Sequence, residues 1–202
     1  MIHLYGKGQS RRGPAFKVPF SSLLAAKCHP LVERFVGSGI LPASPSSFSS
    51  DGMYDYLDRW AELNPTRRVD LFIPAPPGAD KGQSFLYHLA TRNLIAWVFQ
   101  RSLVGDHLGG ALVALLSSLH EFRLPGEDHV GDLVAYLDEE GYLDMRGQPN
   151  HALAVLHLAE HFQLREMYID AFAHCTGMNE RLFLSSEFQV RRLESIESKG
   201  QS

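Results

Sequence analysis

The spacing of apolar residues in this 202-residue chain changes near Gln83, and the change limits the folds open to the chain. Before that point, short segments such as Ala15–Phe20 and Val69–Ile73 alternate apolar and polar residues, which is typical of strands. After it, apolar residues recur every three or four positions, which is typical of amphipathic helices. Early strands and late helices favour an α+β fold over a doubly wound parallel sheet. We therefore predict a small N-terminal mixed sheet and a mainly helical C-terminal two thirds.

Proline, glycine and capping residues divide the chain into its expected elements. A helix should begin near Ser21 or Ser22 and be interrupted at Cys28-His29-Pro30. The later helices are expected around Tyr54–Trp60, Phe85–Phe99, Leu108–Leu119, Val130–Leu137, Asn150–Phe162, Leu164–Cys175 and Phe183–Glu197. A glycine inside a helix costs about 1 kcal/mol relative to alanine. Gly109 and Gly110 therefore either permit close backbone approach or precede the helix, and a start at Ala111 is the simpler interpretation.

The length predicts one domain over residues 1–185, because domains mostly contain about 100–200 residues. Residues 37–53 are rich in Ser, Pro and Gly. They are expected to form a flexible insertion, because such a composition buries little apolar surface. Residues 186–202 are expected to form a C-terminal helix and a frayed tail.

Composition excludes several classes of protein. The chain is 45% hydrophobic and carries a net charge of −4, which argues against global disorder and against nucleic-acid binding. It has no run of about 18 apolar residues, so no membrane span is expected. Only Cys28 and Cys175 are present, and the first residues lack the apolar core of a signal peptide. These features predict an intracellular protein, cytoplasmic or nuclear, with reduced thiols.

One short string matches a catalytic motif. His157, Glu160 and His161 fit H-x-x-E-H, in which two histidines bind zinc and the glutamate activates water. A third ligand would have to come from one of the carboxylates downstream, which are Glu166, Asp170, Glu180, Glu187, Glu194 and Glu197. At about 100° per residue, however, both histidines fall opposite the apolar stripe of their helix, and we expect them to face solvent or a partner. A zinc hydrolase is therefore the alternative interpretation, and the preferred one needs no metal or other cofactor.

The segment from Phe16 through Phe20 into Ser22–Lys27 resembles the strand-to-helix opening of BTB/POZ domains. His151–Cys175 is similar to the paired helices that close those domains. The chain departs from that family at Pro19, in its Ser-rich insertion and in extra helices between Leu108 and Gly141. The resemblance implies a protein-interaction surface, for which the candidates are Phe16, Val18, Phe20, Leu23 and Leu24.

Three other segments resemble an uncharacterised family of filamentous fungi that has no assigned activity. They are LFIPAPPGADKGQSFLYHLATRN, LDEEGYLDMRGQPNHALAVLHLAEHFQLR and YIDAFAHCTGMNERLFLS. This likeness would cover about Val69 to Ser185. We therefore expect a non-enzymatic interaction domain, BTB/POZ-like with insertions, whose partner is an unknown protein or a second copy in a homodimer. The expected surface of such a homodimer is the N-terminal strand and helix.

Overall fold

The computed structural model describes residues 1–37 and 50–190. Most of the expected insertion, and the C-terminal tail beyond residue 190, lie outside the described residues. The rest of the chain separates into two compact units. The first unit contains Met1–Thr91 and Ser118–Glu127, and the second contains Arg92–Ser117 and the chain from Asp128 onward. The sequence predicted one domain over residues 1–185, and both units fall largely within that range.

A small mixed sheet lies at the start of the first unit. Strands β1 (Ile2–His3) and β2 (Leu71–Phe72) pair in parallel, with Ile2 opposite Leu71. Single antiparallel bridges join Ile2 to Phe16 and Leu71 to Val36. The expected strand at Ala15–Phe20 is reduced to the bridge at Phe16. Pro19 lacks the N–H that a longer ladder would need.

Three helices belong to the same unit as this sheet: α1 (Phe20–Ala25), α2 (His29–Phe35) and α3 (Ser50–Leu63). Pro30 lies in the first turn of α2, where a missing N–H costs nothing, so the expected interruption is confirmed. The apolar side chains of these elements form the core of the unit, which includes Ile2, Leu23, Leu31, Val32, Leu57, Leu71 and Ile73. Two longer helices follow, α4 (Lys81–Val98) and α5 (Leu108–Phe122), and each has residues in both units.

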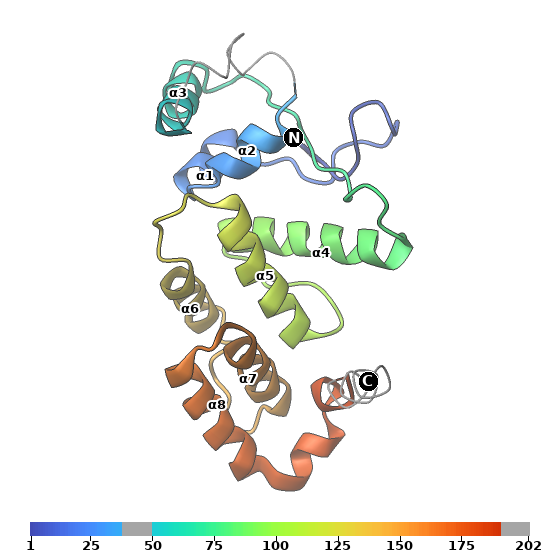
Figure 1. The fold of residues 1–202 in the computed structure, drawn as a ribbon, viewed down its shortest axis with the longest axis vertical. Coiled ribbons are helices and arrows are strands. Elements are labelled where there is room, and N and C mark those ends of the chain that lie inside the picture. The colour runs from blue at the N-terminus through green and yellow to red at the C-terminus, as the bar shows by residue number, and fades with distance from the viewer. Residues whose placement is uncertain (38–49, 191–202) are drawn as a thin grey trace. The chain divides into compact units, whose positions relative to one another are not determined.

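The second unit is built on α6 (His129–Glu139), α7 (Pro149–Phe162) and α8 (Arg165–Met178). A 3-10 helix, η2 (Asn179–Leu184), follows α8. Helices α7 and α8 lie side by side (Figure 1), and only Gln163 and Leu164 connect them. Gln163 adopts a left-handed conformation with φ of 57°, which ends α7 and lets the chain reverse at once into α8.

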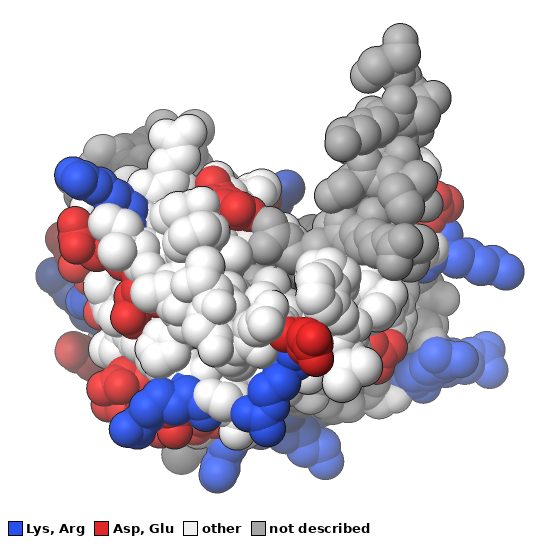
Figure 2. All heavy atoms as spheres, turned by 90° about the horizontal axis from the view of Figure 1, so that it is seen from below, with Lys and Arg blue, Asp and Glu red and all other residues white. Residues whose placement is uncertain are grey.

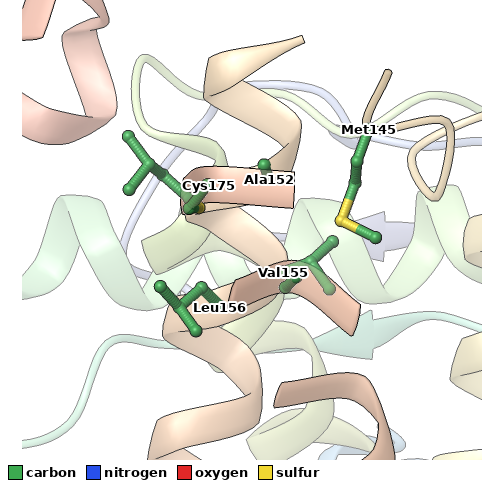
Figure 3. Packing of buried hydrophobic residues seen from close by; sticks show 7 residues of the cluster. Met145, Ala152, Val155, Leu156 and Cys175 are labelled. Atoms are coloured by element: carbon green, nitrogen blue, oxygen red, sulfur yellow. The ribbon is translucent and has the colours of Figure 1, made fainter. Parts of the chain in front are cut away.

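Helix α7 is the centre of this unit. Its buried residues are Ala152, Leu153, Ala154, Val155, Leu156, Leu158 and Ala159, so its core-facing surface covers most of its circumference. Because alanine side chains are small, neighbouring helices can approach α7 closely. Helix α8 packs its own Ala171 and Cys175 against the buried residues of α7. Figure 3 shows Met145 and Val155 pointing toward one another, with Cys175 beside Ala152.

Among the described residues, no helix combines the length and the apolar character that crossing a membrane would require. The mostly helical chain with a small N-terminal sheet confirms the predicted α+β class.

Candidate functional site

The H-x-x-E-H string lies on α7, as predicted, but its two histidines have different surroundings. His161 and Glu160 are exposed, whereas His157 is half-buried. His157 faces the start of α5, because a Cβ added to Gly109 would lie 2.9 Å from its Nδ1 atom. The expectation that both histidines face solvent or a partner is therefore met by His161 and does not hold for His157.

A buried glutamate next to His157 serves a structural purpose that the sequence did not reveal. Glu187 is 4% exposed and accepts hydrogen bonds from the backbone amides of Leu108 (2.5 Å) and Gly109 (3.1 Å). These amides are at the N-terminus of α5, where helical N–H groups lack partners and the helix dipole favours a negative charge. Glu187 thus caps α5 from a distant part of the chain.

The same contacts correct the predicted start of α5. The helix begins at Leu108 and not at Ala111, so both glycines are helical. A Cβ on Gly109 would lie 3.0 Å from Glu187 Oε2, whereas one on Gly110 would meet nothing within 4 Å. Gly109 is therefore required by close approach to Glu187 and His157, which is the other interpretation that the sequence allowed.

The described residues supply only part of a ligand set for zinc. Within the described part of the chain, no group of three or more His, Cys, Asp or Glu side chains converges to hold a metal ion. Glu187 directs both carboxylate oxygens to backbone amides. The described residues around His157 and His161 therefore do not supply three protein ligands for a catalytic zinc. The candidate ligands Glu194 and Glu197 lie outside the described residues. Metal analysis of the purified protein tests the alternative interpretation as a zinc hydrolase. Stoichiometric zinc that is lost on His161→Ala would support that interpretation.

The first unit contains a histidine–aspartate pair that no sequence motif marks. His29 is 1% exposed, and its Nε2 atom lies 2.9 Å from Asp58 Oδ1. The neighbouring Cys28 directs its thiol to the carbonyl of Ala26 at 3.7 Å. Burial raises the pKa of Cys28 to about 12, although the nearby charge of Arg123 opposes this. Cys28 therefore remains a protonated thiol at neutral pH, which is unlike an activated nucleophile.

The interaction surface predicted at the N-terminus is only partly accessible. Leu23 and Leu24 are 1% and 4% exposed, so their assignment to a surface is wrong: they belong to the core. Phe16, Val18 and Phe20 are half-buried. Helical spacing placed both leucines on an apolar face, but it did not show that the rest of the first unit covers that face.

The second unit has an apolar hollow of about 540 Å³, which we call the α8 groove. Its lining residues come from α6, the loop after it, α7 and the start of α8, and they are Val130, Val134, Leu143, Met145, Val155, Leu164, Arg165, Glu166, Met167 and Asp170. Its volume lies within the range of about 300–1,000 Å³ of ligand-binding pockets. No local sequence pattern marks this groove, because it is formed by residues far apart in the chain.

Helix α8 also carries three exposed apolar side chains outside its buried side. Tyr168, Ile169 and Phe172 are 36%, 52% and 49% exposed, and the two aromatic rings stack with centroids 5.8 Å apart. We call these three residues the outer face of α8. On the face of the molecule drawn in Figure 2, uncharged side chains cover most of the centre, and Lys and Arg side chains lie along the edges.

Comparison with known families marks the same part of the chain. A family model described as "Domain of unknown function (DUF8004)" matches residues 130–196. No curated protein and no solved structure matches the chain. The predicted likeness to an uncharacterised family is thus confirmed over this segment. Residues 130–196 are similar to a domain family of unknown function, and they include every residue of the α8 groove and of its outer face.

Proposed function

We propose that this chain is a non-enzymatic protein-interaction module that acts through its second unit. The observation that supports the proposal is the double-sided apolar character of α8. Ala171 and Cys175 are buried on the side that packs against α7, while Tyr168, Ile169 and Phe172 remain exposed on the outer face. Adjacent exposed apolar side chains on a surface helix are typical of sites that bind another protein.

The resemblance of the opening and closing segments to BTB/POZ domains supports the same class of function, because that family consists of interaction modules. We extend the proposal to a BTB/POZ-like fold and to a filamentous-fungal source. We also propose that the protein is intracellular and binds neither nucleic acid nor membranes. Both cysteines are buried thiols outside any disulfide, in keeping with a reducing compartment.

A homodimer is part of this proposal, but the N-terminal strand is a poor candidate for its interface. Both edges of β1 are already occupied, one by β2 and the other by the bridge to Phe16. The outer face of α8 is the better candidate. Light scattering at micromolar concentration tests this part, since a monomer mass for the unmodified chain would exclude the homodimer.

The proposal as a whole is tested by Phe172→Glu, with Thr176→Glu as the matched control. Both residues are exposed and lie one turn apart on α8, so the two variants add the same charge to the same helix. In-cell crosslinking followed by mass spectrometry should recover a defined partner with the unmodified chain and with Thr176→Glu. Phe172→Glu should lose that partner.

Two results would contradict the proposal. One is a set of crosslinked proteins that is the same for both variants and the unmodified chain, because the outer face would then contribute nothing. The other is the absence of any reproducible partner of the unmodified chain.

A further inference from the structure

The α8 groove has an apolar floor and a charged rim. Met145 and Val155 are buried at its base, and Val130, Val134 and Met167 are half-buried along its walls. The charged lining residues Arg165, Glu166 and Asp170 all lie on the first turns of α8 and are exposed. A site of this form binds an apolar group in its base and selects for charge at its edge.

The charges on the rim are not balanced. Glu166 and Asp170 lie four residues apart, so their carboxylates are on the same side of α8 and repel each other. In the described part of the chain, neither forms an ion pair with Lys or Arg, and the only ion pair of Asp170 is with His174, at 3.9 Å. Arg165 is the single basic residue in the lining. A cation placed beside the two carboxylates would relieve their repulsion.

The groove is open to solvent, and α8, which forms part of its rim, also carries the exposed Tyr168, Ile169 and Phe172. A small molecule in a pocket usually has most of its surface enclosed. An open groove whose helix also carries exposed apolar side chains fits a polypeptide better, because a polypeptide can fill the groove and continue over the surface of α8.

We infer that the α8 groove binds a peptide segment of another protein in which a large apolar side chain is accompanied, within one helical turn, by Lys or Arg. This inference rests on the proposed function and names the chemistry of the partner. The apolar side chain would occupy the base formed by Met145 and Val155, and the cation would lie beside Glu166 and Asp170.

The test is to select binders to the full chain from a random 12-residue peptide library displayed on phage. The recovered peptides should share a large apolar residue with Lys or Arg within four positions. Fluorescence anisotropy with the synthetic peptides then measures affinity. Replacing the basic residue of a recovered peptide by Glu should weaken binding at least about tenfold, which corresponds to about 1.4 kcal/mol.

Two pairs of variants locate the binding site. Val134→Lys places a charge in the groove wall, while Ala135→Lys places the same charge on the exposed side of α6. The first should weaken binding at least about tenfold, and the second should leave it unchanged. Glu166→Lys with Asp170→Lys should reverse the preference, so that the Glu-containing peptide binds better. These two residues are exposed, so their replacement should not disturb folding, and Glu180→Lys is the control for added charge.

Recovery of no shared sequence would overturn the inference, as would peptides that bind Val134→Lys as well as the unmodified chain. A peptide preference that the charge reversal leaves unchanged would also overturn it. These failures differ from failure of the proposed function: if Phe172→Glu still removes a crosslinked partner, the interaction module stands and only the assignment of the groove is lost.

Discussion

The carboxylate of Glu187 accepts a hydrogen bond from the backbone amide of Gly109 across 78 positions of sequence, at 3.1 Å. Its second oxygen accepts one from Leu108 at 2.5 Å. The contact holds the segment after η2 against the first turn of α5, within the second unit. A charged acceptor at a helix N-terminus both satisfies unpaired amides and interacts favourably with the helix dipole.

Removing the Glu187 carboxylate should destabilise the protein. Glu187→Ala leaves two helix-terminal amides without this acceptor, and a lost hydrogen bond to a charged group costs about 1.5–3 kcal/mol. Glu187→Gln keeps one acceptor oxygen and should cost about half as much. Urea unfolding followed by circular dichroism measures both free energies. Glu180→Gln, an exposed change on η2, is the control and should stay within about 0.5 kcal/mol of the unmodified chain.

Replacing each of the two adjacent glycines of α5 by alanine should change the stability of the protein in opposite directions. Gly110→Ala should stabilise the protein by about 0.4–1 kcal/mol, because its Cβ would meet nothing within 4 Å and alanine reduces the freedom of the unfolded chain. Gly109→Ala should destabilise it, because the Cβ would lie 2.9 Å from His157 Nδ1 and 3.0 Å from Glu187 Oε2. Thermal unfolding compares the pair, and stabilisation by both substitutions would show that the Glu187 contact is wrongly placed.

The thiol of Cys28 should be unreactive in the folded protein. Burial raises its pKa from 9.0 to about 12, and Arg123 only partly opposes this. A raised thiol pKa means that the unfolded state loses its proton first, so this contribution to stability is intact below pH 9 and is lost between pH 9 and about 12. Iodoacetamide at pH 8 should therefore label Cys28 only after unfolding. Comparison with Cys28→Ala shows how much of the labelling and of the pH dependence is due to this thiol. Rapid labelling of Cys28 in the native protein would contradict the prediction.

Asp70 should make a small, pH-dependent contribution to the stability of the folded protein. Burial tends to raise its pKa, but hydrogen bonds from Arg68 and His3 outweigh this and hold the pKa below 3.8. A lowered carboxyl pKa stabilises the folded state above the unfolded value, and this stabilisation is lost as pH falls through the folded value. Asp70→Asn should cost less than about 1 kcal/mol at pH 7, since the group is partly exposed. The difference in stability between the two proteins should shrink as the pH falls below 3.8, and a difference that does not shrink would have another cause.

Local signals located most helices and several of their ends. Pro30 and Pro149 lie in the first turns of α2 and α7, where proline fits, and α6 is followed by Gly141 with φ of 77°. The expected start of α7 at Asn150 is off by one position, since the helix begins at Pro149. These features depend on the conformations of neighbouring residues, so a short stretch of sequence determines them.

The sequence by itself determined the order of strands and helices and the breaks between them, because periodicity and turn residues act over a few positions. The tertiary structure alone decided what covers each apolar face: Leu23 and Leu24 are enclosed, while Tyr168 and Phe172 are not. It also decided that Glu187, far along the chain, caps α5 at Gly109. Burial and capping of this kind depend on which distant segments meet, and similar local patterns are compatible with a core, a groove or a surface for a partner.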